Sequence, residues 1–159
     1  ISLIGSPSRQ KRGRCNDMNE ATIAAHIGIQ QLYSRYCFGF DGRDSELFLG
    51  CFVEDGVFAV DDREFVGHDA LRPIVGLPGD RPRHHYLNHW VKEVNGESAI
   101  GSAYFLTVDL ATGAISGYGH YDDQLVRGDN EWRFARRDVH FHWQSEAYKA
   151  RTLTVTDAS

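Results

Sequence analysis

An aspartate on the apolar face of a helix is the residue of this sequence whose position best suits chemistry. The segment from Ile23 to Asp41 predicts one long amphipathic helix, on which Tyr33, Cys37 and Asp41 follow at helical spacing along one face. A carboxylate on an apolar face is desolvated, which is a common setting for groups that transfer protons. The alternative is that Asp41 only ends the helix, because Gly42 can serve as its C-cap.

The densest group of polar residues lies in the segment RPRHHYLNHW, residues 81–90. Alternation along a strand predicts one face made of His84, Tyr86, Asn88 and Trp90, and an opposite face made of His85, Leu87, His89 and Val91. One imidazole on the cavity side would be a natural general base, and a carboxylate such as Asp41 would fix its tautomer. The alternative for each histidine is an ordinary surface position on a strand.

Metal binding is a second interpretation of the histidines. Several are near one another in the chain, namely His84, His85, His89, His140 and His142. Their adjacent and alternating spacing does not match a recognisable zinc motif such as HExxH. We therefore expect no metal and no cofactor.

An arginine in the last predicted strand is the second charged residue in an apolar setting. In the segment WRFARRDVHFHW, residues 132–143, Arg137 shares a face with Ala135, Val139, Phe141 and Trp143. A buried guanidinium must meet a carboxylate or an anionic ligand, because an unpaired buried charge costs several kcal/mol. Both roles remain open for Arg137, a substrate contact or a structural ion pair, with Asp41 as one candidate partner.

The elements that must position these residues follow from periodicity and turn chemistry. After the first helix we expect a short helix capped by Asp44, a hairpin pairing Val57–Val60 with Glu64–Val66, and a third helix over Ala70–Val75. Four long strands then follow, at His84–Val94, Ser98–Leu110, Ala114–Val126 and Glu131–Trp143. Helices first and strands afterward predict an α+β fold, in which three N-terminal helices wrap a curved antiparallel sheet into a cone-shaped barrel.

Composition limits the class of protein. The 159 residues, 42% hydrophobic and 12% aromatic, suffice for one domain with a real core. The net charge is −5, and leaving out the four basic residues and one acid of positions 1–17 brings it to −8, which disfavours a nucleic-acid partner. We expect a flexible basic tail at 1–17, the domain at 18–145 and a C-terminal tail at 146–159. The unpaired cysteines Cys15, Cys37 and Cys51 and the lack of a long apolar run predict a cytoplasmic protein without a membrane partner.

Three of these segments carry a family resemblance that spans roughly residues 23–143. They are IQQLYSRYCFGFDGRD at 29–44, HHYLN at 84–88 and WRFARR at 132–137. The chain resembles the SnoaL-like branch of the nuclear-transport-factor-like superfamily, in particular the group containing gamma-hexachlorocyclohexane dehydrochlorinase, scytalone dehydratase and bile-acid 7α-dehydratase. Members of the superfamily also include cyclases, isomerases and pure binding domains, so the fold alone does not fix the reaction.

The resemblance implies a catalytic dyad of Asp41 and a histidine, which the H-x-x-x-N pattern maps onto His84 rather than His85, within hydrogen-bond reach of Asp41. It also implies Tyr36 and Arg137 as further catalytic residues. For substrate binding we expect Tyr33, Phe40, Phe58, Asn88, Tyr104 and Phe141.

The activity implied is that of a cofactor-independent lyase, of the dehydratase or dehydrohalogenase type, acting on a small hydrophobic cyclic molecule. An isomerase or polyketide-type cyclase would use the same dyad. The rival is a non-catalytic ligand-binding domain or an oxygenase small subunit. The resemblance also implies a homotrimer, or else a dimer, and we expect Leu87 and Val91 to face outward and be covered by assembly.

Overall fold

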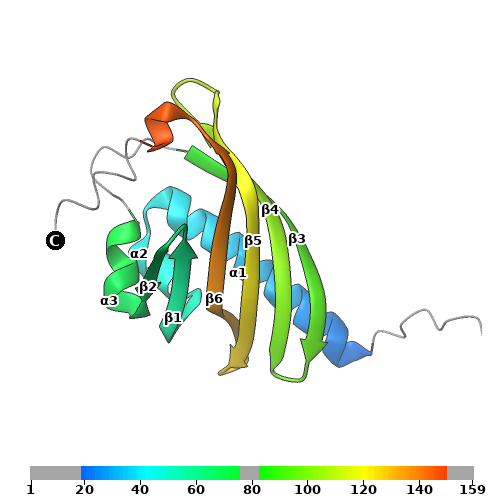
Figure 1. Ribbon diagram of the computed structural model, residues 1–159. Helices are drawn as coiled ribbons and strands as arrows, with labels where there is room; N and C mark the ends of the chain where they lie inside the picture. Colours follow the sequence, from blue (N-terminus) through cyan, green and yellow to red (C-terminus); the bar gives the residue numbers. More distant parts are fainter. Residues whose placement is uncertain (1–18, 76–82, 150–159) are drawn as a thin grey trace, which may run out of the picture.

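A long helix and a curved sheet make up most of the molecule (Figure 1). The computed structural model describes residues 19–75 and 83–149. Helix α1, Glu20–Gly42, begins at an Asn19 cap whose side chain accepts a hydrogen bond from the Thr22 backbone N–H at 2.9 Å. It ends at Arg43, which takes the left-handed conformation with φ 58°. Gly42 is therefore still helical and is not the C-cap that the sequence suggested.

The segment after α1 contains short elements. They are α2 Ser45–Leu49, β1 Phe52–Val60, β2 Arg63–Val66, α3 Gly67–Leu71 and a 3-10 turn at Arg72–Ile74. The Asp44 cap and the β1–β2 hairpin were both expected, and Asp44 accepts a hydrogen bond from the Leu47 N–H at 3.0 Å. The expected helix over Ala70–Val75 is instead split, because Pro73 has no N–H to donate within an α-helix. The expected number of three helices is therefore not exact, because a 3-10 turn follows α3.

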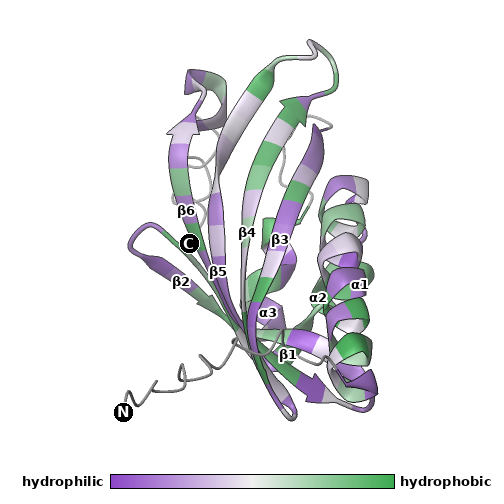
Figure 2. Cartoon of the chain, turned by 90° about the vertical axis from the view of Figure 1, so that its right-hand side faces the viewer, coloured by the Kyte–Doolittle hydropathy of each residue, from purple (hydrophilic) through white to green (hydrophobic). Residues whose placement is uncertain are grey.

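The four long strands form the antiparallel part of the sheet. They are β3 Arg83–Asn95, β4 Ser98–Asp109, β5 Ile115–Gly128 and β6 Glu131–Gln144, each close to its expected range. The strand order is β2-β1-β6-β5-β4-β3, and among these described strands only the β1–β6 pair is parallel. Helix α1 lies along one face of this sheet, which is visible when the molecule is turned (Figure 2). The α+β cone expected from the sequence is confirmed.

Aromatic rings fill the space between α1 and the sheet. Tyr36, fully buried on α1, lies at the centre, with ring centroids within 6.3 Å for Phe40, Phe48, Phe52, Tyr121 and Phe134. Phe105 stacks on Tyr121 with centroids 4.5 Å apart. These rings hold the inner face of the sheet against the helix and surround the polar groups described below.

The faces of β3 are the reverse of those expected. Leu87 and Val91 pack against the core, whereas Tyr86 and Trp90 are 57% and 66% exposed on the outer face. Because side chains alternate along a strand, exchanging the two faces moves every residue of β3 to the other side. The apolar residues expected to be covered by assembly are thus already covered by α1.

The chain beyond β6 continues as helix over residues 146–149, and the Tyr148 ring lies 5.5 Å from that of Phe141. The first residues of the expected C-terminal tail therefore contact the domain. The expected basic tail at 1–17 lies outside the described residues. Within the described ranges, no helix is long and apolar enough to span a membrane.

Candidate active site

A carboxylate and an imidazole meet between the end of α1 and the start of β3. Asp41, in the last turn of α1, places Oδ1 2.5 Å from His85 Nδ1 and accepts the His85 backbone N–H on Oδ2 at 2.8 Å. The His85 side chain is 4% exposed and that of Asp41 is 11% exposed. One carboxylate thus fixes both the ring and the backbone of the same residue.

The histidine that pairs with Asp41 is His85, which corrects the sequence-based choice of His84. His84 Nδ1 lies 3.7 Å from Asp41 Oδ2, beyond hydrogen-bond range, and its side chain is 55% exposed. The physical reason is the face reversal of β3, which places His85 on the side of α1. His84 instead belongs to the outer face of the sheet.

The surroundings of His85 favour its neutral form. Its ring contacts Phe40 and Tyr36 edge-on, at centroid distances of 5.2 and 6.4 Å. Burial lowers the pKa of His85, and the hydrogen bond that its ring donates to Asp41 only partly opposes this effect. With Nδ1–H donated to Asp41, the unprotonated Nε2 is available as a base, since no hydrogen bond to Nε2 occurs within the described part of the chain.

A second buried polar group lies deeper in the same core. Arg137 on β6 donates from Nε and Nη2 to the two carboxylate oxygens of Asp123 on β5, at 2.7 and 2.8 Å. Tyr33 on α1 donates its hydroxyl to the same carboxylate at 2.6 Å. Burial opposes the charged guanidinium, but Asp123 more than compensates and raises the pKa of Arg137. The partner of Arg137 is therefore Asp123, and the suggested pairing with Asp41 is wrong.

Aromatic rings surround the guanidinium. Its central carbon lies 3.9 Å from the ring centre of Phe134, 4.1 Å from that of Tyr121 and 4.2 Å from that of Tyr36. Among the described residues nothing hydrogen-bonds Arg137 Nη1, although this nitrogen is buried. Tyr36 contacts both the guanidinium and the His85 ring, and burial raises its pKa, so its hydroxyl stays protonated at neutral pH. A base, a protonated phenol and a cationic donor thus lie next to one another in the buried core.

A surface groove reaches the dyad between α1 and the edge strand β3. Its volume is about 530 Å³, and His85, Tyr33 and Cys37 contribute to its walls. Its other lining residues are Gln30, Ser34, Phe38, Tyr86, Leu87, Asn88 and His89. The size suits a small organic molecule.

The expected substrate-binding residues are scattered. Phe40 contacts the dyad and Asn88 lines the groove, while Tyr33 is committed to Asp123. Phe58 and Phe141 belong to the core on β1 and β6 without a contact to His85 among the described ring pairs. Tyr104 is 67% exposed on the outer face of the sheet, so it cannot line a site between the sheet and α1.

Asp123 is a buried charged residue of this region that the sequence analysis missed. It alternates along β5 with the buried Tyr121 and Leu125, so it is an acid on an apolar face. The same argument singled out Asp41 and Arg137, and applied to residues 121–125 it would have found the partner of Arg137.

Comparison with known families identifies the class of protein. Residues 21–138 match the model of the SnoaL-like domain, and the chain belongs to this family. Among curated proteins no match was found.

Solved structures extend the comparison. An aspartate-to-asparagine variant of a protein of unknown function from Mycobacterium tuberculosis has 28% identity and a TM-score of 0.73, covering 91% of this chain and 86% of its own. A putative scytalone dehydratase from Novosphingobium aromaticivorans has 22% identity and a TM-score of 0.70, with coverage of 80% and 90%. A hexachlorocyclohexane dehydrochlorinase from Novosphingobium barchaimii has 20% identity and a TM-score of 0.68, with coverage of 79% and 91%. The last two similarities establish the fold alone.

Proposed function

We propose that this protein is a cofactor-independent lyase of the dehydratase or dehydrohalogenase type, acting on a small hydrophobic cyclic molecule. The observation that carries the proposal is the buried His85–Asp41 pair, in which Nδ1 is committed to the carboxylate and Nε2 is left as the base. The names of the two Novosphingobium relatives support the same reaction class.

In the proposed elimination, His85 Nε2 removes a proton from a substrate carbon, and the electrons of the C–H bond form the new double bond. The bond to the leaving group on the neighbouring carbon breaks, releasing hydroxide or halide with its electron pair. In a dehydration, the proton on His85 passes to the leaving oxygen to give water; in a dehydrohalogenation, the halide leaves as an anion and His85 releases the proton to solvent. Asp41 stabilises the imidazolium that forms in between and keeps its ring in place.

Arg137 and Tyr36 would stabilise the charge that develops on the leaving group. Nη1 of Arg137 lies in a low-dielectric core and has no hydrogen-bond partner among the described residues, and such donors stabilise anions strongly. The bidentate Asp123 contact holds the guanidinium in one orientation, so Asp123 acts as a positioning residue. Arg137 would thus combine an ion pair with Asp123 and a substrate contact through Nη1, which has no hydrogen-bond partner in the described part of the chain.

Isomerisation or cyclisation begins with the same proton abstraction and is the nearest alternative reaction. A non-catalytic ligand-binding domain, or an oxygenase small subunit, is the rival outside enzymology. The dyad favours the enzyme, since a binding domain gains nothing from a buried imidazole whose basic nitrogen is kept free.

A ligand screen followed by product analysis tests the proposal. Halogenated and hydroxylated cyclic compounds that raise the melting temperature are incubated with the protein in D₂O, and the products are analysed by mass spectrometry. A lyase releases water or halide, whereas an isomerase returns an isomer carrying solvent deuterium. Binding without turnover for every compound that stabilises the protein would support the non-catalytic rival.

The matched variants are His85→Ala and His84→Ala, which alter adjacent histidines on opposite faces of β3. We expect His85→Ala to abolish turnover and His84→Ala to retain most of it, because only His85 contacts Asp41 at hydrogen-bond distance. Equal losses in the two variants would contradict the assignment of the base.

For the assembly, we propose a homotrimer, as the resemblance to dehydrochlorinases and dehydratases implies. The exposed aromatic residues on the outer face of β3 and β4, Tyr86, Trp90 and Tyr104, provide apolar surface suited to assembly. Light scattering at micromolar concentration should give three times the chain mass of 18.0 kDa. A monomer would refute the proposal, and a dimer would correct its symmetry.

A further inference from the structure

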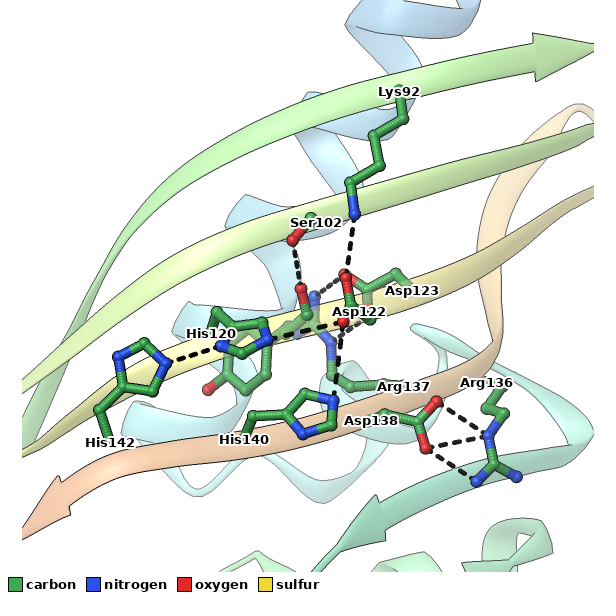
Figure 3. Close-up of polar contacts among 11 residues, drawn as sticks. Lys92, Ser102, His120, Asp122, Asp123, Arg136, Arg137, Asp138, His140 and His142 are labelled. Atoms are coloured by element: carbon green, nitrogen blue, oxygen red, sulfur yellow. Dashed lines mark hydrogen bonds and ion pairs between the residues drawn. The ribbon is translucent and has the colours of Figure 1, made fainter.

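A cluster of metal-ligating side chains lies on the outer face of the sheet, opposite the face that carries His85. His120 and Asp122 on β5 stand beside His140 on β6, because the register pairs His120 directly with His140 (Figure 3). Each residue offers one ligand atom, and the three atoms lie within 4.8 Å of one another. His140 was among the metal candidates of the sequence, whereas His120 and Asp122 were not, since strand pairing is needed to bring these three residues together.

The distances within the cluster suit a shared ion. Asp122 Oδ2 lies 3.6 Å from His120 Nε2 and 3.6 Å from His140 Nε2, which is too long for hydrogen bonds. Ligands of a tetrahedral zinc ion, at bond lengths of about 2.0–2.2 Å, are separated by roughly 3.3 Å. Side-chain adjustments of a few tenths of an ångström would therefore bring Asp122 Oδ2 to the ideal ligand separation from the Nε2 atoms of both histidines.

Neighbouring contacts already orient two of the ligands. His142 Nε2 lies 2.9 Å from His120 Nδ1, which leaves Nε2 of His120 for a metal. Lys92 donates to Asp122 Oδ1 at 3.0 Å and leaves Oδ2 directed at the histidines.

We propose that His120, Asp122 and His140 bind one divalent transition-metal ion of the borderline class, such as Zn²⁺, with His142 as the residue that orients His120. Two imidazoles and one carboxylate are a typical donor set for this class of ion. The ion would join β5 to β6 on the face away from the dyad, so the proposal stands independently of the proposed lyase activity.

The test is a zinc titration of the chelator-treated protein, free of any histidine tag, in competition with a chromophoric chelator. We expect one Zn²⁺ per chain and a higher melting temperature with the ion bound. His120→Ala, His140→Ala and Asp122→Asn should each weaken binding at least tenfold, and His142→Ala about tenfold through the lost orientation of His120.

The control is His26→Ala, which removes a histidine on α1 whose Nδ1 contacts the Thr22 carbonyl. It should leave zinc affinity unchanged, and circular dichroism should show that every variant is folded. Unchanged affinity in His120→Ala and Asp122→Asn would overturn the proposal, as would an equal loss in His26→Ala. Anomalous scattering from a zinc-soaked crystal should place the ion between the three ligands, and an ion found only elsewhere would also overturn it.

Discussion

Asp41 uses both carboxylate oxygens on one residue, and this double contact defines what the side chain does. Oδ2 accepts the backbone N–H of His85, which ties the start of β3 to the end of α1. Oδ1 accepts the hydrogen bond of the His85 ring. Because the carboxylate only accepts, Nδ1 must carry the proton in the neutral dyad. The tautomer of His85 is thus set by the chemistry of its partner.

The variant Asp41→Asn tests this role. An asparagine whose oxygen still accepts the backbone N–H of His85 presents its NH₂ group to Nδ1 of the ring. This contact favours the tautomer with the proton on Nε2, so Nε2 can no longer act as the base. We expect turnover to fall by at least about a hundredfold, with a smaller effect on the free energy of unfolding, about 1–3 kcal/mol. Activity and melting temperature are measured on the same preparation, and a normal rate in a folded Asp41→Asn protein would rule out the dyad.

The lowered pKa of His85 predicts the pH dependence of both activity and stability. Burial lowers the pKa of the native His85 ring below the ordinary imidazole value of 6.5, so the acid limb of kcat/KM should lie below pH 6.5. In the unfolded chain the same ring takes up a proton as the pH falls through 6.5, so its contribution to stability is present above that pH and is lost below it.

The control for this dependence is His85→Gln, which cannot titrate. Unfolding in urea at several pH values should show that the decrease in stability of the native protein on acidification is steeper than that of the variant. An acid limb of kcat/KM centred above pH 6.5 would contradict the expected direction of the shift.

At the scale of elements, the site depends on a close approach between α1 and α2. A Cβ added to Gly39 would lie 2.8 Å from the backbone nitrogen of Phe48, so only glycine allows the two backbones to come this near. The same last turn of α1 carries Asp41, two residues further on. The position of the dyad is therefore coupled to the packing of α2.

Gly39→Ala should destabilise the protein by about 1–3 kcal/mol, because backbone atoms cannot relax as side chains do. The matched control is Gly42→Ala in the same helical turn, where a Cβ meets nothing within 4 Å. This change should be neutral or stabilise the protein by up to about 1 kcal/mol through helix propensity. Thermal unfolding of the two variants checks the difference, and equal effects would argue against a tight α1–α2 contact.

The same scale shows what could be inferred from the sequence. Turn residues between periodic runs located the four long strands to within a few residues, because turn chemistry and alternation are local properties. The inward face of β3 was misjudged because the H-x-x-x-N spacing of His84 and Asn88 was preferred to the apolar pattern of Leu87 and Val91. The apolar residues indicate the buried face directly, and they share it with His85.

For the molecule as a whole, one buried network joins the helix to the two central strands. Tyr33 comes from α1, Asp123 from β5 and Arg137 from β6, and these contacts lie within the aromatic core. The pairing of Asp123 with Arg137 could not be read from local patterns, because it depends on the register that sets the two residues opposite each other. The orientation of the Arg137 guanidinium therefore depends on the packing of α1, β5 and β6 against one another.

Asp123→Asn would leave the buried Arg137 charge without its counterion, and we expect it to lower the free energy of unfolding by about 3–5 kcal/mol. Tyr33→Phe removes only one donor to Asp123 and should cost about 1 kcal/mol. The matched control is Asp122→Asn, the adjacent residue on the outer face, whose effect without metal should stay within about 0.5 kcal/mol. Urea unfolding measures all three, and an Asp123→Asn protein as stable as Asp122→Asn would show that Arg137 does not depend on this carboxylate. The expected loss of stability decreases in the order Asp123→Asn, Tyr33→Phe, Asp122→Asn, and the reason is burial. Asp123→Asn leaves the charge of Arg137 unpaired inside the core, whereas Asp122→Asn exchanges one solvated side chain for another on the outer face.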